Sequence, residues 1–265
     1  MNLERIVADL VERIEHRFYG KYRGIVVDNQ DPAKLGRLKL SVPSVLGSDV
    51  VTGWAMPCTP YGGAANQGFL YIPDAGAAVW TEFEEGDLEF PIWVGSFWSQ
   101  PNSESELPKP NKGSDGSEES DIQDPPTSKI IKTAKGHTLQ FEDADNSEMI
   151  LLREGKKGHF LTMDQNGITV TDANANTIQF TSDGIKVQDT NENTIEMTSD
   201  GVKVTDANEN TIEMTSDGIK ITDLTNNTIE MSKSAFTITA MAPFKIDASG
   251  FAVTVVGKSI DLQKA

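Results

Sequence analysis

The sequence contains a tandem repeat, which restricts the possible folds more than any other feature of the chain. Four segments share one template, and their glycines stand 17 residues apart, at Gly167, Gly184, Gly201 and Gly218. A fixed period of this kind predicts structural units that stack on one another. It also argues against an enzyme, because a catalytic pocket needs different side chains that converge, whereas a repeat supplies the same ones each time.

Each repeat is predicted to form two short β-strands joined by turns. Apolar residues recur two apart, which places them on one face of a strand, while the intervening Lys and Glu residues lie on the other. Asn-x-Asn and Ser-Asp-Gly segments between the strands are typical of turns, since Asn and Asp bond to nearby backbone and Gly accepts a positive φ. The predicted inward-facing residues are Ile185, Val187, Ile195, Met197, Val202, Val204, Ile212, Met214, Ile219, Ile221, Ile229 and Met231.

A strand with only two inward-facing residues cannot enclose a core, so the repeats must stack and the stack must close. The periodicity leaves two closures open. One is a two-sided β-solenoid made by a single chain. The other is an intertwined trimer in which three chains share a narrow apolar axis.

The balance of charge excludes one class of partner. The net charge is -17, and a strongly acidic surface repels phosphate backbones and anionic lipid headgroups, so we expect no nucleic-acid binding. The single cysteine, Cys58, is expected to be a small buried hydrophobic residue rather than a nucleophile. The N-terminus lacks the apolar stretch of a signal peptide, and no apolar run is long enough to span a bilayer, so we expect synthesis in the cytoplasm.

The composition changes along the chain and predicts four regions. The first has apolar residues at helical spacing, the second has strand-like runs with Gly- and Pro-rich loops that suit a small OB-type barrel, the third is polar, and the fourth is β-patterned. These regions are an amphipathic helix at 1–19, a barrel at 20–98, a linker at 99–128, and a β-domain at 129–265 with its repeats at 166–233. Near the C-terminus the period of two continues at Phe251, Val253, Val255, Ile260 and Leu262.

Three stretches resemble a known family when taken in this order. They are YRGIVVDNQDPAKLGRLKLSVPSV, FLYIPDAGAAVWTEFEEGDLEFPIWVGSFW and TAKGHTLQFEDADNSEMILLREGKKGHFLTMDQNGITV. The first two resemble the opening and closing halves of an OB domain, and the third resembles the entry to a β-helix. Together they resemble the central spike of contractile injection machines, namely the phage baseplate assembly protein V family and its VgrG-like relatives.

This resemblance implies an all-β homotrimer. An N-terminal helix and an OB barrel would precede an intertwined, triple-stranded β-helix, or β-prism, with the predicted inward-facing residues as its trimer core. The OB domain and the N-terminal helix would bind the baseplate hub. A small PAAR-type tip protein would bind the C-terminal end, at Phe251, Val253, Val255, Ile260 and Leu262.

The resemblance also implies a purely structural function. The spike would be assembled in a phage tail baseplate or an injection particle, would puncture the target envelope, and would meet the membrane only transiently. No catalytic residue, cofactor or metal is expected. Two alternatives remain: a trimeric receptor-binding fibre or adhesin, and, with less support, a cell-wall hydrolase.

The chain departs from some relatives in two respects. Some carry a lysozyme domain between barrel and prism, where this chain has only the 99–128 segment. Some bind a metal through a His-x-His pair near the C-terminus, whereas the histidines here are His16, His137 and His159. These departures favour a separate tip protein and no enzymatic domain.

The Asp-x-Asn-x-Asn segments of the repeats have two interpretations, turn chemistry and calcium loops. They resemble the first half of an EF-hand loop, but Thr177, Thr194 and Thr211 stand where that loop needs glycine. Turn chemistry is therefore the preferred interpretation. For His137 and His159, a surface or strand-edge position is preferred over a zinc site, because the sequence supplies no further ligands at a suitable spacing.

Overall fold

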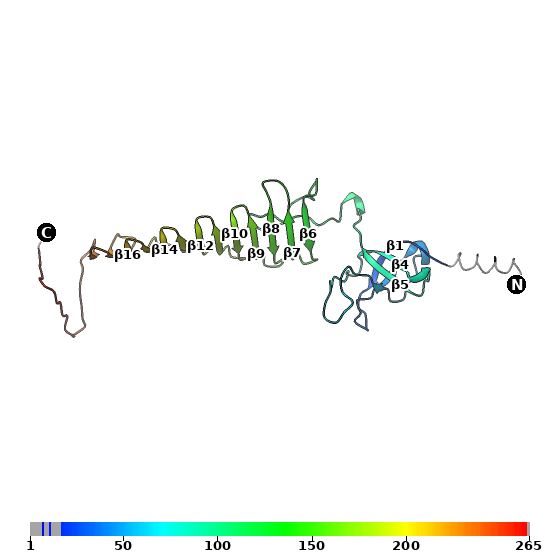
Figure 1. Ribbon diagram of the computed structural model, residues 1–265, viewed down its shortest axis with the longest axis horizontal. Helices are drawn as coiled ribbons and strands as arrows, with labels where there is room; N and C mark the ends of the chain where they lie inside the picture. Colours follow the sequence, from blue (N-terminus) through cyan, green and yellow to red (C-terminus); the bar gives the residue numbers. More distant parts are fainter. Residues whose placement is uncertain (1–6, 8–10, 12–16, 264–265) are drawn as a thin grey trace. The chain divides into compact units, whose positions relative to one another are not determined.

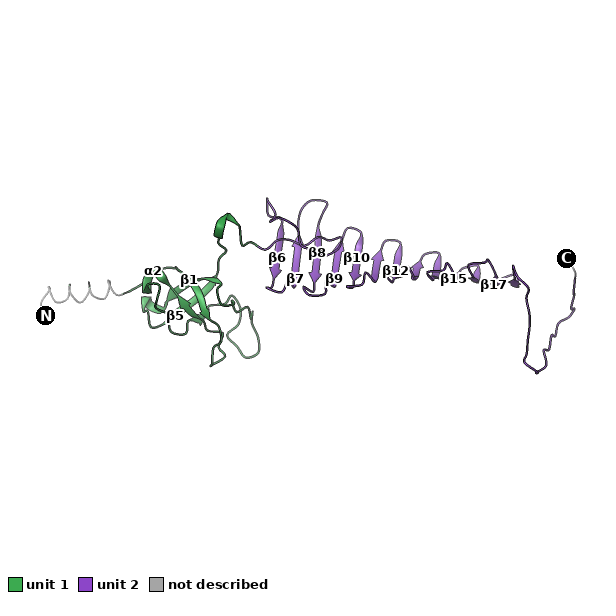
Figure 2. Ribbon diagram, turned by 180° about the vertical axis from the view of Figure 1, so that it is seen from behind, with its two compact units in different colours: residues 1–107 green, residues 108–265 purple. Residues whose placement is uncertain are grey.

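The computed structural model describes residues 7, 11 and 17–263. The chain forms two compact units, residues 1–107 and 108–265, shown in different colours in Figure 2. The described part is mostly β-structure with very little helix, so the all-β class is confirmed. The helix predicted at 1–19 lies almost entirely outside the described residues and stays a prediction.

Unit 1 is built on a five-stranded sheet whose order is β2-β1-β4-β5-β3. Its strands are β1 (Tyr22–Asp28), β2 (Lys39–Ser41), β3 (Met56–Pro57), β4 (Ala78–Phe83) and β5 (Pro91–Ser96). A short helix, α2 (Pro43–Leu46), and two 3-10 turns, η1 (Glu84–Gly86) and η2 (Pro101–Ser103), complete it. Antiparallel bridges Leu38↔Ala55 and Ser41↔Val51 join the two edges of the sheet, so it curls toward a small barrel of the OB type.

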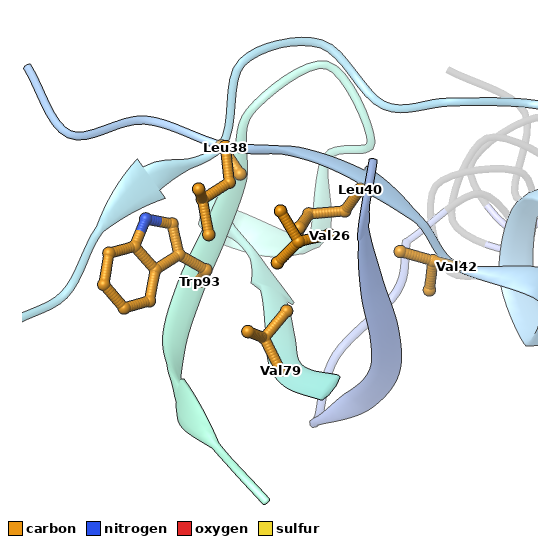
Figure 3. Packing of buried hydrophobic residues seen from close by; sticks show 7 residues of the cluster. Val26, Leu38, Leu40, Val42, Val79 and Trp93 are labelled. Atoms are coloured by element: carbon orange, nitrogen blue, oxygen red, sulfur yellow. The ribbon is translucent and has the colours of Figure 1, made fainter. Parts of the chain in front are cut away.

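The core of unit 1 lies inside this curl. Leu38, Leu40 and Val79 are fully buried, and Trp93 packs against them with its indole Nε1 donating to the Gly36 carbonyl over 3.1 Å (Figure 3). Burial of these side chains removes apolar surface from water and stabilises the unit by itself. One sequence expectation is wrong here: Cys58 is exposed, because it directly follows β3 at the start of a long surface loop.

The Asp-Pro-x-x-x-Gly turn of unit 1 is held by its first residue. The Asp31 carboxylate accepts the backbone N–H groups of Ala33 and Leu35 and forms a two-point contact with Arg37, over 2.6 Å (Nη2–Oδ1) and 3.1 Å (Nε–Oδ2). The Arg37 guanidinium therefore holds the pKa of Asp31 well below its ordinary value. This turn delivers the chain into β2 and places Gly36 against Trp93.

Unit 2 contains a single antiparallel sheet of 13 strands, in which each strand pairs with its neighbours in the chain (Figure 1). The strands are β6 (Ser128–Lys132), β7 (Thr138–Glu142), β8 (Met149–Arg153), β9 (Phe160–Asp164), β10 (Gly167–Thr171), β11 (Thr177–Thr181), β12 (Gly184–Gln188), β13 (Thr194–Thr198), β14 (Gly201–Thr205), β15 (Thr211–Thr215), β16 (Gly218–Thr222), β17 (Thr228–Ser232) and β18 (Phe236–Thr239). The repeat is therefore strand, Asx loop, strand, tight turn, as its sequence predicts.

The polar segment predicted as a linker contains the boundary between the units, after Leu107. From Pro108 onward it belongs to unit 2 and contacts the first strands there. The Asn111 backbone and the Gln140 side chain form two hydrogen bonds, and the Lys132 ammonium donates to the Lys109 carbonyl and pairs with Glu118. The predicted limits of the linker stay a prediction, but its second half is folded.

Candidate assembly surface

From β10 to β18 the apolar strand residues of unit 2 occupy one face of the sheet, here called the open face. The register places Ile185 opposite Met197 and Val187 opposite Ile195, and the same alternation continues through the strand pairs from β10 to β18. All the residues predicted to face inward lie on this face. Within each strand a period of two keeps them together, and the register keeps them aligned between strands.

The open face is uncovered in the described chain. Exposed fractions of Ile195, Ile212 and Ile229 are 42%, 40% and 38%, and those of the methionines between them are similar. From β10 to β18 no described apolar side chain is buried. A contiguous exposed apolar surface of this extent is typical of surfaces that associate with another surface.

The opposite face carries charged pairs and is here called the charged face. Lys186 and Glu196 lie 3.2 Å apart (Nζ–Oε1), and Lys203 and Glu213 lie 3.0 Å apart between the same atoms. These side chains are more than a third exposed, so each pair contributes little to stability by itself. They keep this face soluble and distinguish it from the open face.

Within the described residues, the charged face is covered at its start alone, by residues 108–121, here called the cover segment. Beneath it Leu151 and Phe160 are buried, at 0% and 7% exposed, where later strands place Lys, Glu or Thr. Gly116 packs against the Phe160 ring, where a Cβ atom would stand 3.0 Å from the ring carbons. The first strands thus have a two-layer core that the repeats lack.

One lateral edge of the sheet is made of tight turns that require glycine. A Cβ atom on Gly201 would lie 2.0 Å from the Met214 carbonyl oxygen, and the equivalent distance at Gly184 is 1.9 Å, to Met197. Both residues also have φ near +140°, a region that favours glycine. The glycines that reveal the repeat are therefore fixed by close contact between backbones.

The other lateral edge is made of Asx loops, here called the loop edge. In the loop 189–193, Asp189 Oδ1 accepts the N–H groups of Asn191 and Asn193, each over 2.9 Å, and Oδ2 accepts from Asn193 Nδ2 over 2.6 Å. The hydrogen bond from the Asn193 side-chain amide is the main cause that lowers the pKa of Asp189, and Asn227 likewise lowers that of Asp223 to about 2.

Successive loops are joined by their last asparagine. Asn176 Oδ1 accepts from the Thr190 N–H over 3.0 Å, Asn193 Oδ1 accepts from Ala207 over 2.9 Å, and Asn210 Oδ1 accepts from Leu224 over 3.1 Å. Each asparagine thus binds its own aspartate and the next loop. These contacts occupy the Asx side chains, and among the described residues no three His, Cys, Asp or Glu side chains gather as metal ligands would.

The C-terminal residues predicted to bind a tip protein lie beyond the sheet. After Thr239 the described chain forms no further strand up to Gln263, because a strand requires a hydrogen-bonded neighbour and this segment has none. The five side chains are exposed, from 54% at Val253 to 93% at Leu262. Their predicted role is untested and stays a prediction.

The end of the open face is hollowed. A cavity of about 680 Å³ lies between the last strands and the chain that follows them, and its apolar lining includes Ile221, Ile229, Ile238 and Phe244. The chain after β18 therefore turns toward the open face. This concave apolar surface adds to the area that an additional chain would cover.

Within the described residues, no helix has the length and hydropathy required to cross a bilayer.

A comparison with curated proteins finds no match to this chain. A comparison with protein families finds that residues 22–98 match the type VI secretion system/phage-baseplate injector OB domain. This range coincides with the sheet and core of unit 1 and does not extend into unit 2. Residues 22–98 are thus similar to a structural domain of baseplate-like injection machines, and the family they match is not one of enzymes.

Proposed function

We propose that this chain is the structural central spike of a contractile injection apparatus, in a phage tail baseplate or a related system. The observation that carries the proposal is the open face of a 13-stranded sheet in the same chain as an injector-type OB domain. The match of the OB domain supports a place in an injection apparatus, and the exposed apolar open face supports assembly with further chains.

The spike forms as a homotrimer in which three open faces meet on one axis. A single sheet layer leaves the side chains of Ile195, Ile212 and their neighbours about two-fifths exposed, and association removes this area from water. The charged faces then point outward. The pairing of consecutive strands in one layer supports this closure over a single-chain solenoid, because no second layer of the described chain covers the open face.

The assembled rod transmits force and needs no chemistry. Its OB domains and N-terminal helices bind the baseplate hub, and its C-terminal segment binds a PAAR-type tip protein. Contraction drives the rod through the target envelope, so contact with the membrane is transient. The exposed apolar side chains at the end, Phe251 and Leu262 among them, support the tip contact, since soluble proteins tend to cover such surface.

Light scattering on the purified chain tests the proposal. The expected mass is three times that of the 28.8 kDa chain. A monodisperse monomer, with the open face in water, would contradict it.

The tip contact has a separate test. A chain that ends at Ala242 should remain trimeric but should no longer bind a co-expressed tip protein, while the full chain binds it. Capture of the tip by the truncated trimer would show that the contact lies elsewhere.

A further inference from the structure

The loop edge contains two histidines in positions that asparagine occupies in the repeats. His137 Nδ1 accepts from the Gly155 N–H over 3.1 Å, and His159 Nδ1 accepts from the Ala173 N–H over 3.1 Å. These contacts continue directly into those of Asn176, Asn193, Asn210 and Asn227, which accept from Thr190, Ala207, Leu224 and Met241. The loop edge therefore has six successive links, of which the first two use imidazole and the last four use amide.

The surrounding sequence accounts for this difference. In the repeats, an aspartate four residues before the asparagine accepts from its Nδ2 and fixes the amide, as Asp189 does for Asn193. The residues that make the same loop-closing backbone bond are Thr133 before His137 and Glu154 before His159. Thr133 Oγ1 accepts from the His137 backbone N–H over 3.2 Å, and the Glu154 carboxylate accepts from backbone N–H groups of its own loop, so neither fixes the imidazole that follows it. Imidazole can accept through Nδ1 without such a partner.

Imidazole and amide differ in one property that matters here. An amide oxygen accepts a hydrogen bond at any ordinary pH, whereas Nδ1 accepts only while the imidazole is neutral and its proton is on Nε2. Histidine is also the side chain that gains charge in mild acid. Protonation would turn Nδ1 from an acceptor into a donor that faces another donor.

We propose that His137 and His159 form an acid-sensitive latch at the start of the loop edge, while the four asparagine links of the repeats are insensitive to acid. Protonation opens the loops at 133–137 and 154–159. The cover segment packs on the strands between these loops, so the latch also governs how firmly the two-layer start of unit 2 is held.

The two loops joined by the first link are packed closely together. Gly155 approaches so closely that a Cβ atom on it would stand 1.9 Å from the Lys135 carbonyl oxygen. The two loops have little room to adjust when the acceptor between them is lost. The His137 side chain is 49% exposed, so protons reach it from solvent.

The charged groups around the latch include several cations and one carboxylate that can receive a protonated imidazole. Glu154 Oε1 lies 4.0 Å from His137 Nδ1, and Arg153 Nη1 contacts the Gly136 carbonyl over 3.4 Å. Lys135 precedes His137 in its own loop, Lys156 and Lys157 lie in the loop that faces it, and Asp172 anchors the loop that faces His159. A protonated His137 would thus lose its hydrogen bond from the Gly155 N–H and could donate to the Glu154 carboxylate instead.

The carboxylates of Glu154 and Asp172 have pKa values below the ordinary carboxyl values. Backbone N–H groups, that of Lys157 first, lower the pKa of Glu154, and the Asn176 amide lowers that of Asp172. Both groups therefore keep their charge in mild acid, so neither accounts for an effect at about pH 5.

Amide hydrogen exchange on the full chain tests the latch, with protection factors corrected for intrinsic exchange and compared at about pH 8 and pH 5. The N–H groups of Gly155 and Ala173 should lose protection about tenfold in acid. Those of Thr190, Ala207 and Leu224, whose acceptors are asparagines, serve as internal controls and should keep it. Equal losses at all five amides, or no loss at the first two, would overturn the proposal.

A side-chain measurement and a variant complete the test. Nitrogen-15 NMR of the imidazoles should show the neutral Nε2–H tautomer of both residues at about pH 8, and the Nδ1–H tautomer would overturn the proposal. The double variant H137N/H159N should remove the acid-dependent loss at Gly155 and Ala173. Persistence of that loss in a folded variant would place the titrating group elsewhere, and if the variant fails to fold, the internal controls of the native chain still decide.

Discussion

The two units use β-strands in opposite ways. The sheet of unit 1 curls on itself and buries Leu38, Leu40 and Val79 completely, whereas unit 2 from β10 onward buries no described apolar side chain. Both have apolar residues at a period of two. The two units differ in how the sheet closes. Strands of unequal length, joined by long irregular loops, let unit 1 close within one chain, while strands of nearly equal length, joined by regular turns, keep unit 2 in one open layer. A regular alternation of apolar and polar residues therefore indicates that one face of a sheet is to be covered, but it does not determine how many chains form the core.

The largest expected effect comes from a charge on the open face. Ile195→Asp would place three carboxylates around one dry axis in the trimer, which costs at least several kcal/mol, so we expect loss of assembly. Unit 1 should stay folded, because its core is its own. Light scattering measures assembly, and tryptophan fluorescence reports on unit 1 alone, since all four tryptophans lie there.

The matched control for this change lies next to it on the charged face. Glu196→Gln removes a charge that faces water and should leave the trimer intact. If both variants assemble equally well, the open face is not the contact between copies, and the contrast between the units fails.

A second comparison uses two glycines with nearly the same backbone conformation. Gly201 in unit 2 has φ +139° and no space for a Cβ atom, whereas Gly95 in unit 1 has φ +136° and no heavy atom within 4 Å of that position. Alanine at either site carries backbone strain of about 1–3 kcal/mol. Gly201→Ala should destabilise its unit by about 3 kcal/mol more, since large losses arise where a side chain has no room.

Thermal unfolding followed by circular dichroism measures both glycine variants. Equal losses would show that the Met214 carbonyl can move away, and the tight-turn edge would then be less rigid than the described contacts imply.

A smaller effect is expected from the links of the loop edge. Asn193→Ala removes one hydrogen bond to Ala207 and one to Asp189, whereas Asn29→Ala in unit 1 removes one bond, to the Pro73 carbonyl over 3.1 Å. Each bond contributes about 0.5–1.5 kcal/mol. In a trimer the loss at Asn193 occurs three times per assembly, so its effect on the melting temperature should clearly exceed that of Asn29→Ala. Similar shifts would argue against cooperative unfolding of three chains.

The smallest effect concerns acid. The pKa of Asp223 is lowered from 3.8 to about 2 by its Asn227 partner, and Arg37 lowers that of Asp31 further. A lowered carboxyl pKa stabilises the fold at pH values above the ordinary value, and the contribution is lost as the pH falls through the folded-state value. Carbon-13 NMR of the carboxyl groups should show Asp223 protonating before Asp31, and the reverse order would contradict the assigned contacts.

Much of unit 2 could be predicted because its determinants are local. The turn chemistry of Asp189 and Asn193, the obligatory Gly201 and the alternation of Ile and Met depend on residues close in sequence, so the strands and faces follow directly from the pattern. The proposed trimer and tip site stay predictions, because they concern contacts between chains and the pattern of one chain does not determine these.

The cover segment was missed for a different reason. Its own residues are polar, and it folds because Asn111 bonds to Gln140 and because Leu151 and Phe160 need a cover on the charged face. The sequence did carry a signal: Leu151 and Phe160 stand at strand positions where the later repeats have Lys, Glu or Thr. The histidine links were likewise visible only once the loops were aligned in space.

The asparagine links of the loop edge would give the proposed rod an adjustable length. The last asparagine of each repeat accepts from the loop that follows, and removing residues 184–200 would bring Gly201 directly after Asp183 and restore the same turn. Each 17-residue unit adds two strands, or about 9.6 Å of sheet. The number of repeats would therefore set the length of the proposed rod, and duplication or deletion of a repeat would change that length without altering the contacts between repeats.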